Sequence, residues 1–105
     1  MIRAVFYRDS SDRLTGFSVS GHAGFGEYGQ DMACASVSSA VMLTANTVTE
    51  AFGLKADVKV EENEISLKLE HTDDTGDKLL LGLLTHLYFV SEEFQGRIGI
   101  TFTEV

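Results

Sequence analysis

The chain has 105 residues, of which 44% are hydrophobic and 23% charged, and its formal net charge is −8 at pH 7. This length and composition predict a globular protein with one core, organised as a single cysteine-containing domain over residues 1–105. The chain has sixteen acidic residues and eight basic ones. That balance argues against a nucleic-acid-binding surface, which needs clustered Lys and Arg, and favours a basic partner.

The sequence also bears on the compartment. A single cysteine cannot form an internal disulfide, as expected of a protein in a reducing environment. The N-terminal stretch MIRAVFYRD lacks the pattern of a signal peptide. The longest apolar run, residues 79–84 and 87–90, is interrupted by Gly82 and His86 and is too short to cross a bilayer. We therefore expect a cytoplasmic protein without a membrane partner.

The first half of the chain predicts a hairpin followed by a helix. Residues 2–7 and 14–20 have the character of short strands, and the polar segment 8–12 is suited to the turn between them. From about residue 31, apolar side chains recur at steps of three and four, which is typical of a helix packed on a core. Gly53 is placed to end this helix in the left-handed conformation.

The second half predicts another hairpin, a second helix and a last strand. Residues 57–62 and 64–70 alternate in polarity around a turn at Glu62 and Asn63, residues 73–77 can begin a helix that runs to about residue 94, and residues 98–102 alternate again. The order ββαββαβ predicts a two-layer α+β domain with two helices packed on one face of a five-stranded sheet. The second helix is apolar around much of its circumference, so its exposed side can also support a dimer.

The stretch GHAGFGEYGQDMACASVSSA, residues 21–40, holds the one cysteine, Cys34, and one of three histidines, His22. Asp31 is placed to cap the first helix, which puts Cys34 in its first turn. Free N–H groups and the helix dipole would stabilise a thiolate there, and the N–H groups near Cys34 and Ala35 could hold an oxyanion. A loop that brings His22 to Cys34 would let the imidazole take the thiol proton.

Four glycines in this stretch, at positions 21, 24, 26 and 29, are more than a turn requires. Together with Phe25 and Tyr28 they predict a mobile flap over residues 24–29, which closes on an extended peptide. Ser38 lies one helical turn after Cys34 and can hydrogen-bond either the imidazole or the helix backbone.

Several residues of the stretch have a second interpretation. A free cysteine is usually a small buried side chain, and a loop histidine is usually a solvated one. Asp31 can orient His22 as well as cap the helix, and the cap is the commoner role. Zinc binding by Cys34 and His22 would need Glu27 and Asp31 without a closely spaced ligand pair, so we expect no metal and no cofactor.

The residues Gly21-His22-Ala23, followed by Gly29, Asp31, Cys34-Ala35 and Ser38, closely resemble the signature of the bacterial ribosomal-processing cysteine protease family, Prp. The resemblance extends over the whole chain, although Met32 and Ala33 stand where two larger aliphatic residues are expected. It implies a catalytic dyad in which Cys34 is the nucleophile and His22 the general base. Gly21, Phe25, Tyr28, Asp31 and Ser38 are the candidate supporting or substrate-binding residues.

The resemblance also implies a substrate and an assembly. The substrate would be the N-terminal extension of the twenty-seventh large-subunit ribosomal protein, cut after a pair of phenylalanines, and the enzyme would be a homodimer. Two other functions stay open on the residues alone. One is a ribosome-assembly factor that binds the same basic protein with an inert Cys34, and the other is a different thiol enzyme, although a redox sensor would lack a resolving cysteine.

Overall fold

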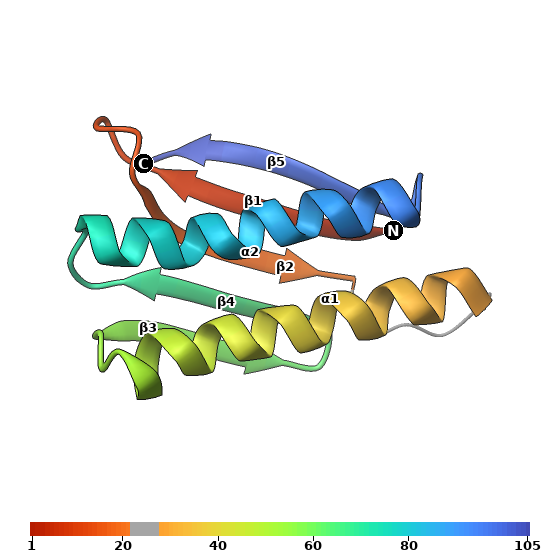
Figure 1. Ribbon diagram of the computed structural model, residues 1–105, viewed down its shortest axis with the longest axis horizontal. Coiled ribbons are helices and arrows are strands. Elements are labelled where there is room, and N and C mark those ends of the chain that lie inside the picture. Colours follow the sequence, from red (N-terminus) through yellow and green to blue (C-terminus); the bar gives the residue numbers. More distant parts are fainter. Residues whose placement is uncertain (22–27) are drawn as a thin grey trace.

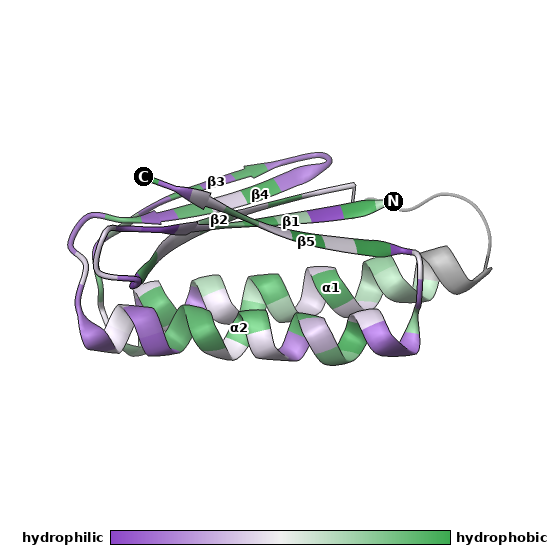
Figure 2. Cartoon of the chain, turned by 90° about the horizontal axis from the view of Figure 1, so that it is seen from above, coloured by the Kyte–Doolittle hydropathy of each residue, from purple (hydrophilic) through white to green (hydrophobic). Residues whose placement is uncertain are grey.

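A computed structural model of the protein describes residues 1–21 and 28–105, and for residues 28–31 it describes the backbone alone. Two helices lie on one face of a five-stranded sheet (Figures 1 and 2). The elements are β1 (Ile2–Arg8), β2 (Leu14–Ser20), α1 (Tyr28–Asn46), the π-helical turn η1 (Thr47–Ala51), β3 (Ala56–Glu61), β4 (Glu64–Leu69), α2 (Asp74–Glu93) and β5 (Ile98–Glu104). The predicted ββαββαβ order and two-layer α+β architecture are confirmed.

The sheet is mixed, with the strand order β3-β4-β2-β1-β5. The pairs β1–β2, β2–β4 and β3–β4 are antiparallel, whereas β1 and β5 run parallel. Ser20 at the end of β2 pairs with Glu64 at the start of β4. The β3–β4 turn therefore lies beside the end of β2, where the chain enters the glycine-rich stretch.

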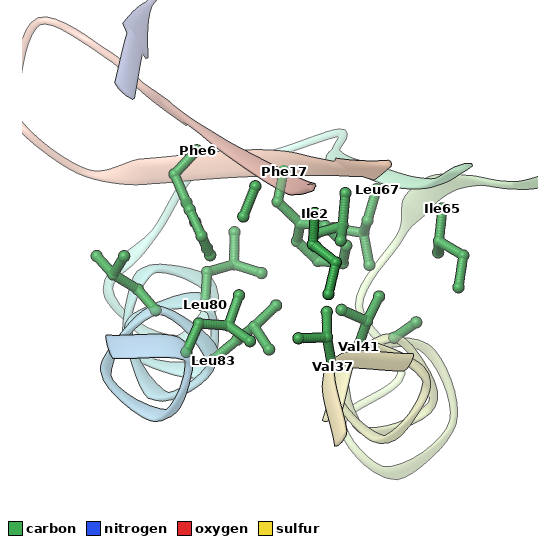
Figure 3. Packing of buried hydrophobic residues seen from close by; sticks show 14 of the residues in the cluster. Ile2, Phe6, Phe17, Val37, Val41, Ile65, Leu67, Leu80 and Leu83 are labelled. Carbon is green, nitrogen blue, oxygen red and sulfur yellow. The ribbon is translucent and has the colours of Figure 1, made fainter. Parts of the chain in front are cut away.

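The core lies between the sheet and the helix layer (Figure 3). The strands contribute large side chains such as Phe6 and Phe17, which are fully buried and whose ring centroids lie 6.2 Å apart. Helix α1 presents Val37 and Val41 to this layer and α2 presents Leu80, all of them at 0% exposure. The alternation along the strands and the steps of three and four along the helices thus produce one continuous apolar layer.

Helix α1 differs from its prediction at one end and agrees at the other. It begins at Tyr28, three residues before Asp31, so Asp31 is not its N-cap. Gly29 made this segment resemble a loop in sequence, because glycine is unfavourable inside a helix. At the other end, η1 is followed by Gly53 with φ +62°, as predicted.

The start of α2 is held by carboxylates. Asp73 is its N-cap, and its Oδ1 accepts a hydrogen bond of 2.7 Å from the backbone N–H of Gly76. The Oδ1 atom of Asp77 accepts the N–H of Leu14 at 2.8 Å, which ties the helix to β2. Arg13 also forms an ion pair with Asp74 at 2.9 Å, and this hydrogen-bonded charge raises the pKa of Arg13.

We expect Asp73→Ala to lower the free energy of unfolding by about 0.5–2 kcal/mol, because α2 loses its cap. Asp73→Asn should retain most of the stability, since its amide oxygen can accept the same bond. Asp74→Ala is the control, because its 84% exposed side chain makes only a surface ion pair, which contributes about 0–1 kcal/mol. Denaturant unfolding of the three variants measures this, and equal losses in Asp73→Ala and Asp74→Ala would contradict the cap.

Candidate active site

The thiol of Cys34 lies at the junction of α1 and the end of β2. Cys34 is 3% exposed and is one of the buried residues of the core. The Sγ atom donates to the backbone carbonyl oxygen of Gly21, at a sulfur–oxygen distance of 3.6 Å. The structure therefore places the cysteine against the backbone of the residue that precedes His22 in the chain.

Gly21 is held in place by two other parts of the chain. Its N–H donates to the carbonyl of Asn63 in the β3–β4 turn, at 3.1 Å. Its φ is +77°, and a Cβ atom there would lie 2.5 Å from the carbonyl oxygen of Met1. This position combines a left-handed backbone with a close approach by the chain at the start of β1, so it requires glycine.

Cys34 is not in the first turn of α1, contrary to prediction. The helix begins at Tyr28, so Cys34 and Ala35 lie in its second turn. An α-helix pairs the N–H groups of its fifth and later residues with carbonyls four residues earlier, so only those of residues 28–31 are left without such a partner. The N–H groups of Cys34 and Ala35 therefore belong to the helical ladder and are not free to hold an oxyanion.

The other candidate residues fall into two groups. His22, Phe25 and Glu27 lie outside the described residues, as does the predicted flap up to residue 27. Tyr28 and Asp31 lie in the first turn of α1, where only the backbone is described, so residues 28 and 29 of the predicted flap are helical.

Ser38 lies one turn beyond Cys34 on α1 and is half-buried. Its place on the helix agrees with the predicted spacing of one turn from Cys34. Among the described residues, no group of three or more His, Cys, Asp and Glu side chains is arranged to hold a metal ion. Zinc binding by Cys34 would also need His22, Glu27 and Asp31, and the side chains of these three residues are not described.

Sequence reasoning missed the contribution of Met1 and Asn63. Both act through backbone carbonyls, which leave no trace in residue type. The turn at Asn63 was predicted, but only the strand order shows that it lies beside Gly21. A predicted pairing of β2 with β4 would have placed Asn63 beside Gly21.

A lone cysteine at a strand–helix junction, in a two-layer α+β domain, fits the class of thiol-dependent enzymes that attack with a cysteine. The model of the cysteine protease Prp family matches residues 1–99. The chain belongs to this family and is a cysteine protease, as the resemblance in its sequence predicts.

Relatives and solved structures agree with this assignment. The ribosomal processing cysteine protease Prp of Bacillus subtilis is 24% identical over 108 residues, which cover 96% of each chain. The crystal structure of the essential ribosomal processing protease Prp from S. aureus, in complex with a substrate peptide, has the same fold with a TM-score of 0.90. That pair is 22% identical and covers 98% of this chain and 100% of the other.

A second crystal structure of the S. aureus protease contains a covalently linked product peptide. It superposes with a TM-score of 0.81 at 22% identity, and covers 98% of this chain and 100% of that one. The relatives therefore share the fold of this protein along nearly its whole length.

Proposed function

We propose that this protein is an endopeptidase of ribosome maturation. Its substrate is the N-terminal extension of the twenty-seventh large-subunit ribosomal protein, cut after a pair of phenylalanines. The whole chain acts as one protease domain in the cytoplasm and works as a homodimer. The relatives are ribosomal processing cysteine proteases, which supports the process, and the resemblance of the GHA and GxDxxCAxxS segments supports the substrate.

One observation carries the proposal: the Sγ atom of Cys34 lies 3.6 Å from the carbonyl of Gly21, the residue directly before His22. The residue directly before His22 in the chain is thus in contact with the thiol. A histidine that follows this contact in the chain is a candidate base for the thiol proton.

The proposed chemistry uses Cys34 and His22 in turn. His22 takes the proton from the thiol, and the sulfur attacks the scissile carbonyl carbon. As the C–N bond breaks, the leaving amine takes that proton from the imidazolium, and the peptide stays on Cys34 as a thioester. His22 then removes a proton from a water molecule that attacks the thioester. The C–S bond breaks, the peptide leaves with a new carboxyl group, and the sulfur takes the proton back from the imidazolium.

The burial of Cys34 adds a requirement to this scheme. With 3% of the residue exposed, the sulfur must be uncovered before it can meet a peptide carbonyl. We therefore propose that the correct peptide drives this change by induced fit, and that part of its binding energy is used to do so. A basic ribosomal protein also suits a chain of net charge −8.

The same burial favours one competing function. A thiol that stays inaccessible would suit an assembly factor that binds the ribosomal protein without cutting it. Family membership favours the protease, because the matching model is that of a cysteine protease. The two functions differ in whether the extension is cut.

The test is incubation of the purified protein with the precursor of that ribosomal protein, with the products read by mass spectrometry. We expect one cut directly after the phenylalanine pair. A precursor with both phenylalanines replaced by alanine is the control and should stay whole. Binding of the precursor without any cut would refute the protease, whereas a cut elsewhere would refute the proposed motif.

A further inference from the structure

Strand β3 forms one edge of the sheet. Among the described residues, the strand order β3-β4-β2-β1-β5 gives β3 a single partner strand, β4. An edge strand presents unpaired N–H and C=O groups along its outer side, and another extended chain can add to it as a further strand. The groups that β3 presents, and the side chains around them, decide which chain can do so.

The hydrogen bonds of β3 identify its free backbone groups. The N–H of Glu70 donates to the carbonyl of Lys55 at 3.0 Å, directly before β3 begins. In an antiparallel pair, residues that bond to the partner strand alternate with residues whose backbone groups point away from it. Every second residue from Lys55 onward therefore bonds to β4, and the residues between them present N–H and C=O groups at the open edge. These open-edge residues are Ala56, Val58 and Val60.

The side chain of Val60 is uncovered at this edge. Val60 pairs with the core residue Ile65, so both side chains lie on the face of the sheet that carries the helices. Ile65 is 3% exposed, whereas Val60 is 62% exposed. Helix α1 crosses β3 at an angle in Figure 1, and the last part of β3 lies beside the helix rather than beneath it. A strand added to β3 would therefore bury an apolar side chain that the helix layer leaves in solvent.

The open edge of β3 lies within reach of the thiol. β3 ends at Glu61, two residues before Asn63, whose carbonyl accepts the N–H of Gly21 at 3.1 Å. Gly21 in turn contacts the Sγ atom of Cys34. A strand added to β3 would lie three strand spacings from β2, which is about 14 Å. An extended chain covers that distance in about four residues, so a substrate can contact Cys34 and β3 together.

Carboxylates surround the turn end of β3. Residues 56–64 contain four acidic residues and one basic residue, Lys59. The acidic residues are Asp57, Glu61, Glu62 and Glu64. At the opposite edge of the sheet, Arg97 precedes β5, and the guanidinium of Arg8 lies 4.3 Å from the ring centroid of Phe102 in that strand. A basic peptide is therefore attracted to β3 more than to β5.

We propose that β3 is an exosite that binds an extended basic segment of the substrate as an added strand. The segment lies about four or more residues from the bond that is cut. Main-chain hydrogen bonds to the open-edge residues hold it, one of its apolar side chains covers Val60, and the carboxylates attract its Lys and Arg side chains. A second copy of this chain, with its own net charge of −8, is repelled where a basic peptide is attracted. This inference rests on the proposed peptidase function.

The test compares the full ribosomal precursor with a peptide that extends about three residues to each side of the cut, too short to reach β3. We expect Val60→Pro to lower kcat/KM for the precursor about tenfold, mainly through KM, and to leave the short peptide unaffected. Proline removes an N–H at the open edge without removing a bond to β4. Val60→Lys keeps the N–H and adds a positive charge at an exposed position, so it should also weaken the precursor alone.

Two variants of β5 are the matched controls. The N–H of Ile2 donates to the carbonyl of Arg97 at 2.9 Å, so by the alternation of a parallel pair Ile100 presents its N–H at the other open edge. Ile100→Pro therefore makes the same backbone change away from β3. Thr101→Lys adds the same charge at an exposed position of β5. Both controls should cut the two substrates like the wild type, and circular dichroism of all four variants checks the fold.

Three results would overturn the exosite. They are equal losses on the short peptide and the precursor in both Val60 variants, wild-type rates on both substrates in Val60→Lys, and self-association in sedimentation that only the Val60 variants lose. The last result would assign the open edge to a second copy. If the wild-type chain cuts neither substrate, the proposed function fails, and calorimetric titration with the precursor still tests β3. Its dissociation constant should then rise about tenfold in Val60→Lys and stay unchanged in Thr101→Lys.

Discussion

Cys34→Ala is expected to abolish peptide cleavage, because the chain has no second thiol that could form a covalent intermediate. Cys34→Ser should be nearly as inactive, although its hydroxyl can still donate to the carbonyl of Gly21. Both variants should unfold close to the wild type, since each changes one small buried side chain. Turnover of a Phe-Phe peptide and denaturant unfolding, measured on the same preparations, give the two quantities.

His22→Ala should lose almost as much activity, because the proposed base for the thiol proton is then missing. His86→Ala is the matched control, since His86 lines a groove between α1 and α2 and Cys34 does not. A variant without Cys34 that retains more than a few per cent of turnover would refute the nucleophile. Full activity of His22→Ala would refute the base while leaving the cysteine in its role.

Gly21→Ala is expected to reduce both stability and turnover. Its φ of +77° is strained for alanine, and the new Cβ atom would lie 2.5 Å from the carbonyl oxygen of Met1. We expect a loss of about 1–3 kcal/mol in the free energy of unfolding. We also expect turnover to fall by about a hundredfold, because the backbone against Cys34 and next to His22 is displaced.

Gly96→Ala separates the effect of backbone strain from the effect of the close contact with Met1. Its φ of +79° is almost the same, but no atom lies within 4 Å of its Cβ position. This variant should therefore show only the backbone strain, of about 1–2 kcal/mol, and keep its turnover. If Gly21→Ala turns over as fast as Gly96→Ala, the fixed position of Gly21 is not needed for catalysis.

The sequence predicts local structure well in this protein. The polarity alternation around Asn63 placed the β3–β4 hairpin, and Asp73 marked the start of α2. Gly53 marked the end of the first helical segment through its left-handed backbone. Each of these features depends on residues that are close together in the chain, so residue type alone carries the information.

The start of α1 and the surroundings of the thiol could not be predicted in the same way. Gly29 resembles a loop residue, and only the folded chain shows it inside the first turn. The contacts of Gly21 with Met1 and Asn63 join backbone atoms from distant segments. Periodicity reports which side of a strand is buried, but it does not report which strand lies next to it.

The parallel pairing of β1 with β5 has a consequence for synthesis of the chain. Ile2 at the start of β1 pairs with Ile98 at the start of β5, so β1 cannot complete its pairing until the much later β5 has been made. Until then β1 has an open edge, which is a site for pairing with other chains. Contacts between such distant segments also slow folding. We infer that the nascent protein is most prone to aggregate just before β5 is released.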